Sequence, residues 1–160
     1  MYFNGAAHCR GAGAGVVFVT SLGEVLPYSF TLTQLCSNNV AEYQALILGL
    51  EMAVEMKRLQ LQAFGYSQLV VNQLLGSYEV KKPKLCPYHD YAKKLMGWLG
   101  DVTIQHVPRK ENKKIITDNG KTFDNRLMNK IYDLFGFKQR NSSMYNAAAN
   151  GLAEAFNKTL

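Results

Sequence analysis

This sequence of 160 residues has few cysteines, few prolines and no long hydrophobic run. The three cysteines are far apart and form no Cys-x-x-Cys pair, which argues against a disulfide framework and against a zinc site. No apolar stretch reaches the length of a membrane span, and the N-terminus lacks the basic and then apolar layout of a signal peptide. We therefore expect free thiols, no membrane partner, and a nuclear or cytoplasmic location.

Hydrophobic content and net charge limit the class of protein and the kind of partner that the sequence allows. Hydrophobic residues make up 48% of the chain and are spread along it, which predicts a folded core rather than disorder or a fibre. The net charge of +6 is compatible with a polyanionic partner, but an ordinary solvated basic surface is equally common. At this length, one compact domain is the default expectation.

Apolar periodicity and turn residues predict a mixed sheet with helices packed on it. Segments that are rich in β-branched residues or alternate between apolar and polar residues are typical of strands. Segments with an apolar residue every three or four positions are typical of helices. The glycine and alanine residues between Gly11 and Gly15 predict a tight turn. The predicted strands are 1–7, 16–20, 25–32, 61–66 and 102–107, and the predicted helices are 39–60, 67–76 and 87–100.

The first of these helices organises the chain. Asn39 is a candidate cap, and Glu42, three residues later, is positioned to close a capping box. Two apolar stripes follow, so the helix is expected to be buried on two sides. In a sheet of this kind Asn4 and Tyr66, which lie on the first and fourth strands, should meet the start of this helix at one edge, where ligand sites of α/β proteins gather.

Four segments carry a resemblance to a known family. They are Phe3–Ala6, Asn39–Leu46, Gly65–Val70 and His106–Asn112, and together they resemble ribonuclease H, most closely the ribonuclease H domains of gypsy-type long-terminal-repeat retrotransposons. The likeness covers residues 1 to about 114. It implies an α/β ribonuclease H-like fold, with a mixed five-stranded sheet and helices on both faces, and cleavage of the RNA strand of RNA–DNA hybrids.

The resemblance also implies a two-magnesium site held by four carboxylates, which activates water and stabilises the leaving oxygen. Only Glu42 is retained at these positions, as the one candidate metal ligand. The other three hold Asn4, Tyr66 and Ile116: a neutral amide, a phenol that is normally protonated at neutral pH, and a hydrocarbon. We therefore expect a catalytically dead or strongly impaired enzyme, with magnesium as cofactor only if activity remains.

Residues from about 115 to 160 resemble the later half of a retrotransposon integrase core. Asp118, in Asp-Asn-Gly, and Glu154, in Asn-Gly-x-Ala-Glu, match two of its carboxylates, and thirty-five residues lie between them. Taken alone, Asp118 could be an ordinary turn residue and Glu154 a solvated helix position. The sequence predicts a ribonuclease H-like domain at 1–114 and a partial integrase-like segment at 115–160. That segment would replace the final helix, packing on its own chain as a monomer or on a second chain as an exchanged dimer.

Several polar and basic residues are candidates for contact with nucleic acid. Tyr88, Tyr91 and Trp98, which lie among basic residues, are expected in the core rather than as stacking platforms. The candidate contacts are Gly5, Asn39, Ser67, Gln68, Lys82, Arg109 and Asn112.

Three functions follow from these patterns. The first is a retrotransposon-derived protein that binds RNA–DNA hybrid or double-stranded nucleic acid with little or no catalysis. The second is a residual metal-dependent hybrid ribonuclease, in which Glu42 acts with a carboxylate such as Asp118. The third is a module that binds a protein partner.

Overall fold

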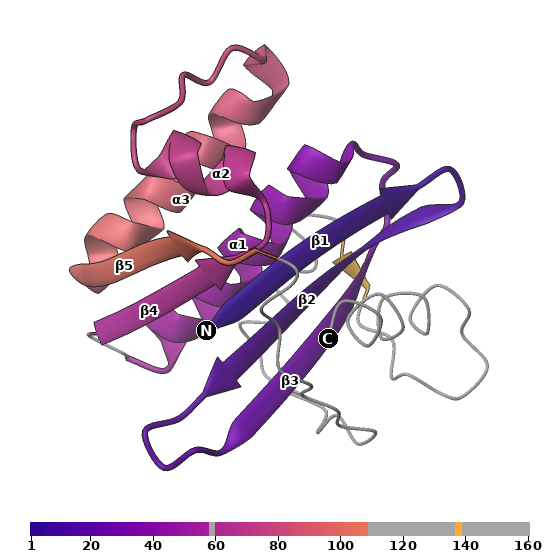
Figure 1. Ribbon diagram of the computed structural model, residues 1–160. Coiled ribbons are helices and arrows are strands. Elements are labelled where there is room, and N and C mark those ends of the chain that lie inside the picture. Colours follow the sequence, from indigo (N-terminus) through magenta and orange to yellow (C-terminus); the bar gives the residue numbers. More distant parts are fainter. Residues whose placement is uncertain (58–59, 109–136, 139–160) are drawn as a thin grey trace.

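The computed structural model describes residues 1–57, 60–108 and 137–138, which form one mixed sheet with helices packed against it (Figure 1). The strand order is β5-β4-β1-β2-β3-β6. The strands are β1 (Tyr2–His8), β2 (Gly11–Val19), β3 (Val25–Leu32), β4 (Gln60–Gly65), β5 (Asp101–His106) and β6 (Phe137–Lys138). The helices are α1 (Asn38–Glu55), α2 (Gln68–Leu74), the 3₁₀ turn η1 (Pro83–Leu85) and α3 (Cys86–Leu99).

The first five strands confirm the predicted mixed sheet. β1, β2 and β3 are joined by turns and pair antiparallel, whereas β4 pairs parallel to β1, and β5 parallel to β4. A parallel pair needs a long crossover, which α1 provides between β3 and β4. The two residues of β6 add a sixth strand, antiparallel to Thr31 and Leu32 of β3.

The segment Gly11–Gly15 forms the first half of β2, so the predicted tight turn is wrong there. The chain reverses instead at Cys9 and Arg10, immediately before β2. Gly13 and Gly15 are buried because β1 pairs with β2 on one side and β3 on the other along this stretch. Pairing on both sides overrides the weak local preference of glycine against strands.

Helix α1 lies at the centre of the fold, and its predicted burial on two sides is confirmed. Thirteen consecutive residues, from Ala41 to Ala53, are buried, because the helix packs on β1 and β2 and also on α3. The helix ends at Glu55, earlier than predicted, and Gln60 already belongs to β4.

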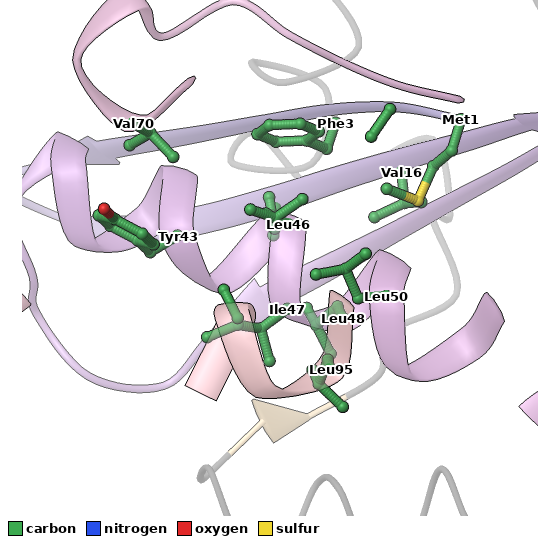
Figure 2. Close-up of a cluster of buried hydrophobic side chains, with 14 of the residues drawn as sticks. Met1, Phe3, Val16, Tyr43, Leu46, Ile47, Leu48, Leu50, Val70 and Leu95 are labelled. Atoms are coloured by element: carbon green, nitrogen blue, oxygen red, sulfur yellow. The ribbon is translucent and has the colours of Figure 1, made fainter. Parts of the chain in front are cut away.

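One hydrophobic core joins the helices to a single face of the sheet. Figure 2 shows Phe3 and Val16 of the sheet opposite Leu46 of α1, with Leu95 of α3 beyond Leu48. Alternation along the paired strands places every sheet residue of this core on that one face. The helices of the described residues therefore pack on one face. The predicted helices on both faces are therefore not found among the described residues, whose helices all cover the face that carries the core. The segment predicted to replace the final helix, residues 115–160, lies outside the described residues apart from β6. Within the described ranges, every helix is too short or too polar to cross a bilayer.

A carboxyl group is buried between α1 and α3. The hydroxyl of Tyr91 donates to Oε1 of Glu51 at 2.6 Å, while Oε2 of Glu51 is buried and finds no hydrogen-bond partner in the part of the chain that the structure describes. The side chain of Glu51 is only 8% exposed, and this burial raises its pKa above the ordinary 4.5, although the bond from Tyr91 opposes the shift.

We predict that Glu51→Gln stabilises the fold at neutral pH. A raised folded-state pKa means that the contribution of Glu51 is fully present below its unfolded pKa and is lost as the pH rises through the folded value. The difference in unfolding free energy between Glu51→Gln and the parent should therefore be small near pH 4 and should grow toward pH 8. Urea denaturation across this range measures it, with the exposed Glu24→Gln as the control. A difference that does not change with pH would show that Glu51 is uncharged or well compensated throughout.

Candidate functional site

The carboxyl ends of β1 and β4 and the start of α1 meet at one edge of the sheet. In the parallel pairing of β1 with β4, Tyr2 is opposite Phe64 and Phe3 opposite Gly65. Asn4 is the next residue of β1, and Tyr66 directly follows β4, so the two residues are neighbours at this edge. The predicted meeting of the first and fourth strands is therefore present in the backbone.

Gly5 brings β1 against the start of α1. A Cβ atom at Gly5 would lie well under 3.0 Å from backbone atoms of Ala41 and Glu42, so only glycine allows this approach. The backbone N–H of Gly5 donates to Oε2 of Glu42 at 3.0 Å, and Glu42 is 5% exposed. Glu42 is thus a buried carboxylate held beside Asn4 by a strand that is 37 residues away in the sequence.

The predicted capping box at the start of α1 is wrong. The N-cap is Ser37, whose hydroxyl accepts from the N–H of Val40 at 3.4 Å. Asn39 is the second residue of the helix and not its cap, so Glu42 cannot close a capping box with it, and Oε2 of Glu42 accepts from β1. Asn38, which was not among the predicted site residues, accepts from the N–H of Ala7 at 2.8 Å and so ties the helix start to β1. Its place beside Ser37 and Asn39, in a run of residues that accept backbone hydrogen bonds, was the available signal.

Asn4 contributes an unusual polar atom to this edge. Its Oδ1 is buried and has no hydrogen-bond partner among the described residues, while the residue as a whole is half-buried. A buried acceptor without a donor is unfavourable by about 1–3 kcal/mol, so such an atom needs a functional or structural reason.

We tested whether the residues at this edge fit the magnesium site that the resemblance implies. Magnesium requires near-octahedral oxygen ligands and usually carboxylates, whereas this edge offers one carboxylate, one amide and one phenol. Among the described residues there is no cluster of three or more histidine, cysteine, aspartate or glutamate side chains that could hold a metal. The described donor set therefore does not fit a two-magnesium centre. Ile116, Asp118 and Glu154 lie outside the described residues.

Polar candidates for nucleic-acid contact surround the same edge. Ser67 caps α2 by accepting from the N–H of Val70 at 3.3 Å, as predicted, and Gln68 next to it is exposed. Asn39 is half-buried at the start of α1. The structure thus brings Gly5, Asn39, Ser67 and Gln68 to the edge that holds Asn4, Glu42 and Tyr66, and we call these seven residues the candidate interface.

Basic residues in the described part of the chain lie between α2 and α3 and on α3 itself. Lys82 is exposed in the loop before η1, next to Lys81, and Lys84 is exposed within η1. On α3, Lys93 is engaged, since its ammonium donates to the carbonyl of Leu74 at 3.3 Å. Arg109 and Asn112 are outside the described residues.

The aromatic residues of α3 differ in how far they are buried. Tyr88 and Tyr91 are partly buried and pack against the core, as predicted. Trp98 is 60% exposed, so its predicted core position is wrong. The buried stripe of α3 runs through Ala92, Leu95 and Leu99, and Trp98 lies at the margin of this stripe.

Comparison with known proteins adds a family to this geometry. Residues 3–117 match the family model described as reverse transcriptase-like. The chain is 35% identical over 117 residues to ribonuclease HI of Halobacterium salinarum, covering 71% of this chain and 58% of that protein. It is 33% identical over 123 residues to a bifunctional protein of Mycobacterium tuberculosis, covering 76% of this chain and 31% of that one. The chain thus spans less than two thirds of the length of these relatives.

Two solved ribonuclease H1 structures are similar to this chain in both fold and sequence. The crystal structure of the Halobacterium salinarum ribonuclease H1 has a TM-score of 0.63 and 35% identity, over 68% of this chain and 83% of that one. A ribonuclease H1 named LC11, solved in complex with an RNA/DNA hybrid, has a TM-score of 0.63 and 30% identity, over 69% of this chain and 86% of that one.

Proposed function

Because the chain belongs to the reverse transcriptase-like family and has the ribonuclease H-like fold, we propose that it binds RNA–DNA hybrids at the candidate interface and cleaves them weakly or not at all. The observation that carries this proposal is the pairing of an intact edge with an incomplete ligand set. Gly5, Glu42 and the cap residue Ser67 are in place, whereas Asn4 and Tyr66 stand where the family pattern has aspartates.

The binding half of the proposal is supported by the geometry of the edge. Ser67 and Gln68 at the start of α2, and Asn39 at the start of α1, present hydroxyl and amide groups beside β1. Such groups contact phosphates and 2′-hydroxyls in complexes with RNA. The solved hybrid complex of the LC11 relative supports the same class of ligand for this chain.

The weak-cleavage half is supported by the chemistry of the donors. A neutral amide in place of a carboxylate removes one negative charge, and a phenol in place of a second removes another. The carboxylate that remains, Glu42, already accepts a hydrogen bond from Gly5. Binding should therefore need no divalent cation, which distinguishes this proposal from a residual ribonuclease.

The test is a labelled 20-base-pair hybrid titrated with the chain in magnesium and in EDTA, with cleavage followed on the same samples. We expect equal affinity in both buffers and cleavage near background in magnesium. Loss of binding in EDTA, together with clear cleavage in magnesium, would favour the residual ribonuclease instead.

We further propose that the chain derives from a gypsy-type retrotransposon and that its tail is integrase-derived. The support is the likeness of the four ribonuclease H segments and the spacing of Asp118 and Glu154. On this proposal, residues 1–114 and 115–160 are two pieces that were joined, with the second docked on the first.

We predict that hybrid affinity falls steeply with salt and that the double variant Lys82→Ala, Arg109→Ala flattens this dependence. Each lost phosphate contact should lower the slope of log affinity against log salt by about 1. Fluorescence anisotropy between 50 and 300 mM KCl measures the slope, and Lys57→Ala at the end of α1 is the matched control. An unchanged slope would favour the alternative function, in which the chain is a module that binds a protein partner.

A further inference from the structure

The single tryptophan of the chain is a large exposed aromatic surface. Trp98 lies in the last turn of α3 and is 60% exposed. Leu95 and Leu99, in the same half of this helix, are buried in the core, and Met96 is partly buried against it. The indole therefore contributes little to the core and is available to a ligand.

A lysine is placed over this ring. The ammonium nitrogen of Lys94, one helical turn before Trp98, lies 5.0 Å from the ring centroid, within the range of a cation–π contact. Lys94 is exposed, and it is not tied to a backbone carbonyl as Lys93 is. An aromatic face for a base and a neighbouring cation for a phosphate are the two elements of single-strand nucleic-acid sites.

This pair lies at the end of the sheet opposite the candidate interface. Helix α3 ends at Leu99, and β5 begins at Asp101, which pairs with Gln60 at the start of β4. Tyr66 follows the far end of β4, and six strand residues span about 20 Å. Trp98 is thus remote from the candidate interface. A single strand of nucleic acid that extends beyond a bound hybrid could reach it.

We propose that Trp98 and Lys94 form a second nucleic-acid contact, which binds the single-stranded extension of a hybrid held at the candidate interface. One base stacks on the indole, and the ammonium of Lys94 binds an adjacent phosphate. This inference rests on the proposed function, because the hybrid positions the extension. The exposed carboxylate of Asp101, close to this end of α3, disfavours a second phosphate there, so the contact is limited to about one or two nucleotides.

The experiment compares a blunt hybrid with the same hybrid carrying an eight-nucleotide thymidine extension. Anisotropy should show about tenfold tighter binding of the extended hybrid by the parent chain, as expected for one stacked base. Trp98→Ala should abolish this preference and leave the affinity for the blunt hybrid unchanged. Lys94→Gln should reduce it partly, and Leu22→Ala, which truncates another exposed apolar residue away from α3, should retain it.

A second readout does not depend on the candidate interface. Because Trp98 is the only tryptophan, quenching of its emission by free oligothymidylate reports stacking directly. If the blunt hybrid does not bind but oligothymidylate quenches Trp98, the proposed function fails and the contact at α3 stands. If the blunt hybrid binds, yet the extension adds no affinity and no quenching occurs, the proposed function stands and this inference is overturned.

Discussion

Replacing both Asn4 and Tyr66 with aspartate should raise magnesium-dependent hybrid cleavage by about 100-fold or more over the parent chain. The two positions are neighbours at the carboxyl ends of β1 and β4, and Glu42 is held beside them by Gly5. Two regained carboxylates would give magnesium three charged oxygen ligands, and about 3 kcal/mol of added stabilisation of the transition state corresponds to this factor. The measurement is gel analysis of a labelled hybrid at saturating protein.

The gain should depend on the ligands acting as one unit. Each single variant should recover much less than the double variant, and Glu42→Gln in the double background should remove the activity again. A matched control is the pair Gln60→Asp and Gln62→Asp on exposed positions of β4, which adds the same charge elsewhere on that strand. Robust cleavage by the parent chain that disappears in Glu42→Ala would contradict the proposal of an impaired enzyme.

Gly5→Ala should destabilise the protein by about 3 kcal/mol or more. The added methyl group would collide with backbone atoms of Ala41 and Glu42, which belong to the buried central helix and have no room to move. Separation of β1 from α1 would also break the hydrogen bond between the Gly5 N–H and Glu42. Chemical denaturation measures the change, and hybrid binding should weaken in parallel because the candidate interface is assembled on this contact.

The control is the same substitution at Gly97 on α3. A Cβ there meets no atom of the described residues within 4 Å, and alanine favours a helix more than glycine does, so Gly97→Ala should stabilise the fold by about 0.5–1 kcal/mol. Similar small effects of the two substitutions would show that the approach of β1 to α1 is looser than the structure describes.

Local signals predicted several elements and helix ends correctly. Ser67 as the cap of α2, Val25–Leu32 as β3 and Gly100 as the end of α3 were each predicted from a few neighbouring residues and are confirmed. Gly100 has a φ of 83°, a conformation in which a glycine ends a helix without strain. Caps and terminators act through bonds within a few residues, and therefore the sequence alone can indicate them.

The errors fall where distant segments compete with local preference. The Gly11–Gly15 segment became a strand because β1 and β3 supply hydrogen bonds on both sides. The capping box predicted for Glu42 is wrong because the helix is capped at Ser37, and Glu42 accepts instead from the N–H of Gly5, which is distant in the sequence. Trp98 is exposed because the buried stripe of α3 is already complete without it.

The sequence by itself determined the family, the order of the elements and the absence of a carboxylate at Asn4 and Tyr66, since these depend on residue identity and on contacts between near neighbours. Only the tertiary structure decided that Asn4 would present a buried oxygen with no partner in the described ranges and that Glu42 would bind the backbone of β1. Both follow from the close approach of β1 to α1 at Gly5, which exists only when the sheet and the central helix pack together.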